Sequence, residues 1–205
     1  MKRNLTVVCV LVGACTLFFA AVTAVGAAYG IIPVIVCGAV MTLVGIWAFI
    51  GSVLRERIYE RAENRMGCGD YYGALAVLDK ASRNHLFFPL YRMIVYQLYV
   101  RAELAIDDVA AAAKHADCLR HAGGDGWKYR TAFYVVLFNL DWEDLSAAQA
   151  EYESFKNACA HSALYREQIS VLDALFARLG GENAPLPEAA KNSPYPVVHR
   201  LIERY

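Results

Sequence analysis

Two histidines and a cysteine lie three residues apart in the middle of the chain, and they are the first candidates for chemistry. They are His115, Cys118 and His121, and Asp117 stands four residues before His121. Imidazole nitrogens and thiolates bind zinc and related ions. On a helix, each step of three residues turns the side chain by about 60°, so at most two of the three would meet at one ion. We expect a solvated helix face and no metal site.

Sequence patterns that carry catalysis or nucleotide binding are missing. The glycine-rich segment 123–126 has no strand before it and lacks the Lys-Ser or Lys-Thr pair of a phosphate-binding loop. The chain has no nucleophile elbow, no His-Glu-x-x-His helix and no cysteine-histidine pair with an orienting group. We therefore predict no enzymatic activity and no cofactor.

Cysteine placement and charge exclude other classes of protein. Three of the six cysteines, Cys9, Cys15 and Cys37, lie in an apolar stretch, and the others are widely separated, which predicts free thiols in a reducing compartment. The chain has 20 basic and 20 acidic residues, and only two of the basic ones precede residue 55. The remainder is slightly acidic, so we expect no nucleic-acid partner.

An uncharged stretch fills residues 5–54, which contain no Asp, Glu, Lys, Arg or His. A helix needs roughly 20 apolar residues to cross the hydrocarbon core of a bilayer, so this stretch suffices for two crossings. Segment 26–33 contains two glycines, Tyr29 and Pro33, which suit a turn followed by a new helix. The sequence predicts a transmembrane hairpin with spans at residues 5–27 and 32–54, and the lipid bilayer as a partner.

Basic residues flank the outer ends of the predicted hairpin and are absent from its turn. They are Lys2, Arg3, Arg55, Arg57, Arg61 and Arg65. Because such residues tend to stay in the cytoplasm, we predict a multi-pass protein of a bacterial inner membrane with both termini cytoplasmic. The alternative is a lipoprotein modified at Cys15, but the sequence stays apolar long after that residue.

Small residues at helical spacing predict which faces of the two spans touch, because membrane helices associate through close packing. They are Ala20, Ala24 and Ala28 in the first span and Gly38, Thr42, Gly45 and Ser52 in the second. Neither span contains an Asp, Glu, Lys, Arg or His, so we expect an anchor and not a path for ions.

Residues 55–179 show helical periodicity throughout, so the predicted fold class is all-α. Helix breakers divide this region into helices of about 12 to 18 residues with short connections, which is typical of antiparallel helix pairs. No Gly-, Pro- or Ser-rich linker separates Leu54 from Arg55. We therefore expect the second span to continue directly as the first helix of the domain at 55–180.

In segment 62–81, Gly69-Asp70-Tyr71 is preceded by Ala62 and followed by Ala74 and, seven residues later, by Ala81. This arrangement resembles one tetratricopeptide repeat, in which Ala62 would stand where the two helices cross, Gly69-Asp70-Tyr71 at the turn and Ala74 at the tight contact in the second helix. The resemblance implies a solenoid of helix pairs.

Two more degenerate copies of this pattern follow. Asp107 with Ala111, and Asp141 with Leu145, come at intervals of 37 and 34 residues from Asp70 and Asp107, close to the tetratricopeptide period. The resemblance covers about residues 55–160, with 162–179 as a capping helix. An unrelated helical bundle with a coincidental period is the alternative.

The resemblance also implies a concave groove that binds peptide segments of other proteins. Its candidate contacts are Tyr59, Glu63, Met93, Tyr96, Val100, Trp127, Arg130 and Tyr134. Aromatic rings and one arginine would suit an extended peptide with an acidic or C-terminal carboxylate. The alternative is that tyrosines at helical spacing form the core.

The last part of the chain, residues 181–205, is predicted as a proline-containing connection and an amphipathic helix. Ser193-Pro194 suits a helix start, and Val198, Leu201, Ile202 and Tyr205 form an apolar stripe. This helix either docks on the end of the repeat domain or is displayed for a partner.

Taken together, these features predict a membrane-anchored adaptor that recruits unknown protein partners at the cytoplasmic face. The alternative is a small accessory subunit of a larger membrane complex, in which the hairpin is the functional contact. Homo-oligomer formation stays open.

Overall fold

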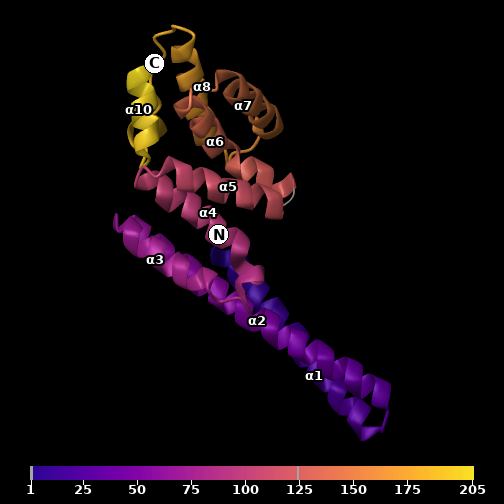
Figure 1. Ribbon diagram of the computed structural model, residues 1–205. Coiled ribbons are helices and arrows are strands. Elements are labelled where there is room, and N and C mark those ends of the chain that lie inside the picture. The colour runs from indigo at the N-terminus through magenta and orange to yellow at the C-terminus, as the bar shows by residue number, and fades with distance from the viewer. Residues whose placement is uncertain (1, 124) are drawn as a thin grey trace. The chain divides into compact units, whose positions relative to one another are not determined.

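The computed structural model describes the backbone of residues 2–123 and 125–205 and the side chains of residues 10–122 and 129–205. Helices make up 81% of the chain, and the residues whose backbone is described contain no strand (Figure 1). This confirms the predicted all-α class. The helices are α1 (Lys2–Ala28), α2 (Ile32–Gly67), α3 (Tyr71–Ser82), α4 (Phe88–Ala105), α5 (Val109–Gly123), α6 (Asp125–Asp141), α7 (Leu145–Cys159), α8 (Arg166–Leu179), α9 (Glu188–Lys191) and α10 (Pro196–Arg204).

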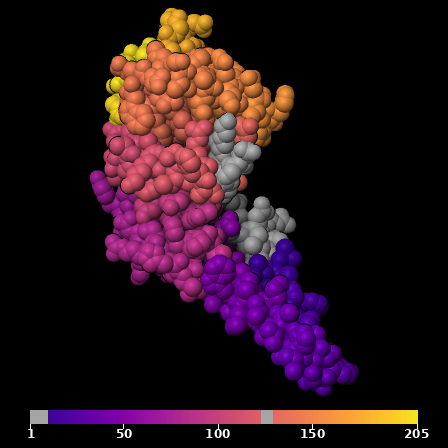
Figure 2. Space-filling view, turned by 45° about the vertical axis from the view of Figure 1, so that its right-hand side comes forward, coloured from indigo at the N-terminus to yellow at the C-terminus, as the bar shows by residue number. Residues whose placement is uncertain are grey.

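Helices α1 and α2 are both long and apolar enough to cross a membrane. They are joined by a tight turn in which Gly30 has a φ of 67° and the N–H of Ile31 donates to the carbonyl of Gly26 over 3.0 Å. Their large apolar side chains are exposed along the hairpin, which Figure 2 draws in indigo and purple. Exposure of this kind suits lipid as the surrounding medium.

Helix α2 continues without a break for 36 residues, from the uncharged stretch into the charged sequence after Leu54. This confirms that the second apolar helix runs directly into the following region. A single continuous helix is a stiff connection, because every interior backbone group is held by an intrahelical bond.

The chain divides into two compact units, one formed by Met1–Asn64 with Ala76–Val95 and the other by Arg65–Leu75 with Tyr96–Tyr205. This division differs from the boundary expected at residue 55. The first unit includes part of the helical region because Leu90 of α4 packs against Gly51 of α2, where a Cβ would lie 3.2 Å from that of Leu90. The uncharged stretch is therefore packed by later residues at its end.

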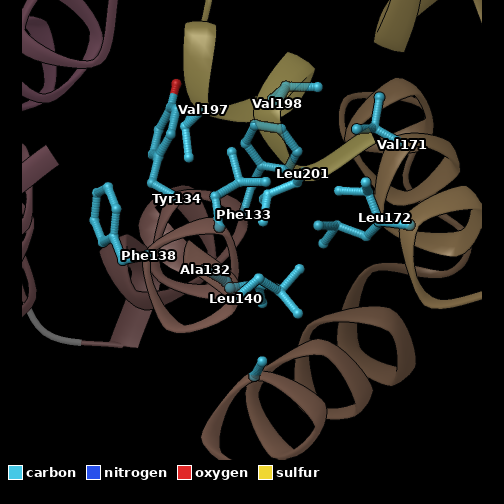
Figure 3. Close-up of a cluster of buried hydrophobic side chains, with 14 of the residues drawn as sticks. Ala132, Phe133, Tyr134, Phe138, Leu140, Val171, Leu172, Val197, Val198 and Leu201 are labelled. Carbon is cyan, nitrogen blue, oxygen red and sulfur yellow. The ribbon is translucent and has the colours of Figure 1, made fainter. Parts of the chain in front are cut away.

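The core of the second unit surrounds α6 (Figure 3). Leu137 and Leu140 of α6, Leu172 of α8 and Leu201 of α10 are each at most 1% exposed. Burial of a leucine side chain stabilises a fold by roughly 1.5–3 kcal/mol, so these contacts hold α6, α8 and α10 together.

The C-terminal helix α10 docks on this core and is not displayed. Val198 and Leu201 of the predicted stripe are fully buried, while Ile202 and Tyr205 are half-buried. The helix begins at Pro196, and not at Pro194 as the sequence suggested, because Tyr195 is its N-cap. A proline in the first turn costs no hydrogen bond.

Candidate interaction surfaces

Three helix-helix connections, α2–α3, α4–α5 and α6–α7, have the same backbone conformation. Each contains one residue with positive φ, namely Gly69 at 77°, Asp107 at 66° and Glu143 at 64°. The next residue donates its N–H to the carbonyl five positions earlier, over 2.8–2.9 Å. This is the Schellman type of helix end, in which glycine is the usual left-handed residue. Gly69 and Asp107 are 38 residues apart, and Asp107 and Glu143 are 36 apart.

An aspartate follows each left-handed residue and caps the next helix. Asp70, Asp108 and Asp144 each accept the backbone N–H three positions on, over 2.9–3.1 Å. Such a cap satisfies one of the backbone donors that a helix start leaves without a partner. In the first of these caps, the Gly73 N–H and then the Arg65 guanidinium lower the pKa of the Asp70 carboxyl.

Small residues recur around the three caps at fixed distances. Four residues after each cap stands an alanine with no exposed surface, and eight residues before each cap stands another fully buried small or β-branched residue. The alanines are Ala74, Ala112 and Ala148, and the preceding residues are Ala62, Val100 and Val136. Each pair of helices is therefore built on the same pattern of burial.

This pattern corrects the predicted register of the second and third copies. The structural equivalents of Asp70 are Asp108 and Asp144, and not Asp107 and Asp141. Likewise Ala112 and Ala148 replace the expected Ala111 and Leu145. The positions of the second and third turns could not be recognised in the sequence, because acidic residues, and not glycines, occupy the left-handed positions 107 and 143.

Asp107 and Asp141, which were expected at the turns, form ion pairs with the C-terminal helix α10. Arg200 of α10 forms ion pairs with Asp107 and with Asp141, the latter over 3.3 Å. Arg204 lies 3.7 Å from Glu143. A small network of charges thus ties the ends of α4 and α6 to α10, and these pairs could not be predicted from sequence spacing.

The candidate groove residues are not all on the surface. Val100 and Tyr134 are 0% and 6% exposed and belong to the core, so they are not groove contacts, and this corrects the prediction. Val100 stands at the helix crossing, and the ring of Tyr134 packs edge-on against Tyr195, 6.0 Å away. Proximity of the C-terminal connection to α6 was not visible in the sequence.

The other groove candidates are distributed over both units. Tyr59, Glu63 and Met93 are half-buried in the first unit, whereas in the second unit Tyr96 is half-buried and Arg130 is exposed. The side chain of Trp127 lies outside the described residues. Burial raises the pKa of the Tyr165 phenol, and the positive charge of Arg130 offsets part of this rise.

His115 lies in an arrangement that the sequence did not suggest. Its ring stacks on Tyr99 with 4.3 Å between the ring centres, and its Nδ1 lies 2.8 Å from Oε2 of Glu103, which is 6% exposed. His121 is exposed and pairs with Asp117 over 3.1 Å. Among the described residues, no group of three His, Cys, Asp or Glu side chains could hold a metal ion.

A second polar cluster joins α7 to α8. The hydroxyl of Tyr152 donates to Asp173, and Nζ of Lys156 lies 2.9 Å from both the Tyr152 oxygen and Asp173. Burial, and then the bond to Asp173, raise the pKa of the Tyr152 phenol, while bonds to Tyr152 and Asp173 raise the pKa of Lys156. The hydrogen bonds of Tyr152 and Lys156 to Asp173 tie α7 to α8.

The contact face of the apolar hairpin is only partly the predicted one. Gly38 is buried against Thr23, and Gly45 is half-buried against Thr16. Thr42 and Ser52 are half-buried. The prediction for the first span is wrong, because Ala20, Ala24 and Ala28 are all exposed.

Threonines, and not the expected alanines, lie at this face. They can do so because each hydroxyl has a hydrogen-bond acceptor in its own helix. Thr16 donates to the carbonyl of Val12 and Thr23 to that of Phe19, both over 2.8 Å. Thr42 and Ser52 make equivalent bonds in α2, over 2.7 and 2.9 Å. The hydroxyl oxygens of Thr23 and Thr16 face Gly38 and Gly45 and already have a partner in their own helix, so no hydroxyl needs water.

Comparison with known proteins gives no relative for this chain: no protein-family model, curated protein or solved structure matches it.

Proposed function

We propose that this protein is a membrane-anchored protein-binding module, in which the α1–α2 hairpin is the anchor and the helix pairs from α2 onward bind a peptide segment of another protein. The observation that carries the proposal is the continuity of α2 from an uncharged stretch into a charged helix. A helix of this kind couples a membrane span to a folded domain without a flexible tether.

The hydrogen bonds of the polar side chains in the hairpin support its role as a membrane anchor. The hydroxyls of Thr16, Thr23, Thr42 and Ser52 all bond to carbonyls of their own helices. A membrane helix must satisfy its polar groups internally, because lipid offers no partner. Basic residues at both outer ends of the hairpin support cytoplasmic termini and a bacterial inner membrane as the location of the protein.

The repeated turns support a tetratricopeptide-like solenoid as the binding part. Three helix ends share a left-handed residue, an aspartate cap and a buried alanine four positions later. Repeats of this kind form extended surfaces that bind other proteins. With Val100 and Tyr134 in the core, the binding residues of the second unit become Tyr96, Trp127 and Arg130, and a peptide with a carboxylate suits the arginine.

Capture from bacterial membranes tests this function. The full-length protein is purified in mild detergent, and the proteins that copurify are identified and quantified. We expect Trp127→Ala with Arg130→Ala to lower recovery of a specific partner at least about tenfold, as hot-spot losses do. Arg166→Ala, at another exposed arginine, is the matched control and should change nothing. Unchanged recovery with the double variant would contradict the binding surface.

A second candidate function is that the hairpin itself contacts other membrane helices as an accessory subunit. An apolar recess of about 300 Å³ on the hairpin, lined by Gly13, Leu17 and Phe49 among others, favours it. A bulky side chain at Gly13 would fill this recess. Loss of the partner with Gly13→Leu, and not with the Trp127 and Arg130 variant, would support this function.

A further inference from the structure

A cationic pocket lies in the first unit, directly after the uncharged stretch. It has a volume of about 230 Å³ and is formed by α2, α3 and the start of α4. Arg57 and Arg61 of α2 and Lys80 of α3 line it, together with Asn84 in the connection after α3. Its remaining wall is largely aliphatic and includes Ile58 and Val77.

The three cations of this pocket lack a direct ion-pair partner among the residues that the structure describes. Arg57, Arg61 and Lys80 are all exposed. No carboxylate is among the lining residues described. Like charges brought together without a counter-charge repel each other, so an anion in the pocket would lower this cost.

The pocket lies at the expected depth of the lipid phosphates. A helix rises 1.5 Å per residue, which places Arg57 roughly 5 Å and Arg61 roughly 10 Å beyond Leu54, the last uncharged residue of the stretch. The headgroup layer on each side of a bilayer is on the order of 5–8 Å thick. When the apolar part of α2 fills the hydrocarbon core, Arg57 therefore lies within the headgroup layer and the backbone of Arg61 lies just outside it. The Arg61 side chain leans back toward the layer, because side chains of a helix tilt toward its N-terminus.

The connection between α3 and α4, which carries Asn84 of the pocket, is held against the last two turns of the uncharged stretch. The indole N–H of Trp47 donates to the carbonyl of Leu86 over 3.1 Å, and Leu90 packs on Gly51. Leu86 is itself 64% exposed. These contacts hold the connection between α3 and α4 beside the end of the span, where an indole ring and exposed leucine suit the membrane interface.

We propose that this pocket binds the phosphate group of an anionic phospholipid from the surrounding bilayer. The two guanidinium groups and the ammonium group bind the phosphate oxygens, and the aliphatic wall contacts the glycerol part of the lipid. The inference rests on the proposed function in one respect, since it requires the hairpin to be in the bilayer. The inference extends the proposed function by naming one class of lipid that the anchored protein binds.

Binding of phosphatidylglycerol to the full-length protein tests the proposal. The protein is placed in nanodiscs of phosphatidylcholine containing about one fifth phosphatidylglycerol, and retained lipids are counted by native mass spectrometry. The test variant carries Arg57→Gln, Arg61→Gln and Lys80→Gln. The matched control carries Lys114→Gln, Arg166→Gln and Lys191→Gln, which also removes three positive charges from exposed positions, all of them in the second unit.

We expect the wild type and the control to retain one phosphatidylglycerol, and the test variant to bind it at least about tenfold more weakly, because each basic group near the headgroups contributes to the attraction. Equal retention by all three proteins overturns the proposal. Inorganic phosphate is added to the detergent-solubilised protein as a second arm. Tight binding of inorganic phosphate without preference for the anionic lipid also overturns it, since the lipid would not be the source.

Incorporation into neutral phosphatidylcholine vesicles separates this inference from the anchor. All three proteins should float with such vesicles and resist extraction at alkaline pH, because the hairpin is unchanged. A wild-type protein that is extracted contradicts the membrane anchor itself. A wild-type protein that stays inserted, but binds phosphatidylglycerol no better than the test variant, contradicts only the pocket.

Discussion

Gly38 of α2 lies so close to Thr23 of α1 that a Cβ on the glycine would be 3.1 Å from the Thr23 Cα. The same relationship holds seven residues on, where a Cβ on Gly45 would be 3.3 Å from the Thr16 Cα. Two glycines one heptad apart thus accept two threonines one heptad apart. This spacing keeps the contact on one side of each helix along the hairpin.

Substitution of Gly38 by leucine should force the two apolar helices apart. Overpacking of a close contact costs about 1–3 kcal/mol, and here backbone and not only a flexible side chain opposes the new group. We expect altered mobility of the hairpin on SDS gels and a lower melting temperature in detergent. Ala24→Leu is the control, because Ala24 is exposed and should tolerate the change. Equal effects of both substitutions would argue against the close contact.

Replacement of Arg200 by alanine should loosen α10 without unfolding the second unit. Arg200 pairs with Asp107 and Asp141, but it is more than a third exposed, so solvent screening reduces its contribution to about 1 kcal/mol or less. We expect faster hydrogen exchange at the backbone of α10, and a smaller difference from wild type in 1 M salt. Arg166→Ala should leave the exchange unchanged.

The apolar contacts of the same helix should matter more than its charges. Leu201 is fully buried, and truncation of a buried leucine to alanine typically costs 2–5 kcal/mol. If Leu201→Ala released α10 no further than Arg200→Ala, the ionic network would be the dominant attachment.

Part of the fold could be predicted from the sequence alone. The absence of charge over residues 5–54 predicted two apolar helices, and Gly69-Asp70 predicted the first repeated turn, because both signals are local. The later turns were misplaced because Asp107 and Glu143 adopt a conformation usually taken by glycine. Their charges are used by Arg200 and Arg204, which lie more than fifty residues away in the chain.

Side-chain burial was harder to predict, because it depends on packing between distant segments. Alanines at four-residue spacing in α1 were expected at the hairpin contact, yet threonines with satisfied hydroxyls occupy it. Tyr134 had the spacing of a groove residue, but Tyr195 packs against it. In both cases the decisive partner belongs to another part of the chain.

Removal of the Asp70 cap should fray the start of α3. The Asp70 carboxylate accepts the N–H of Gly73 over 2.9 Å and pairs with Arg65 over 2.5 Å. Because these contacts lower the pKa of Asp70 below its ordinary value of 3.8, the stabilisation is present above that pH and is lost as the pH falls below it. We expect Asp70→Ala to speed hydrogen exchange in the first turn of α3 at neutral pH. Asp70→Asn keeps an acceptor oxygen and should have a smaller effect.

Replacement of Tyr152 by phenylalanine should weaken the tie between α7 and α8. The variant loses the hydrogen bond to Asp173, a bond to a charged group worth about 1.5–3 kcal/mol before screening, and we expect a melting temperature lower by roughly 2–6 °C. Tyr72→Phe, at a side chain that is 73% exposed, is the control and should melt like the wild type.

Alkaline pH provides an independent check on the same cluster. The pKa values of Tyr152 and Lys156 are both raised in the fold, from ordinary values of 10.0 and 10.5. The stabilisation from each group is therefore fully present below its ordinary pKa and is lost as the pH rises through the raised value. Wild type and Tyr152→Phe should differ in melting temperature at pH 8 and converge above pH 10. A difference that stays constant over this range would show that the phenol proton does not contribute to the tie.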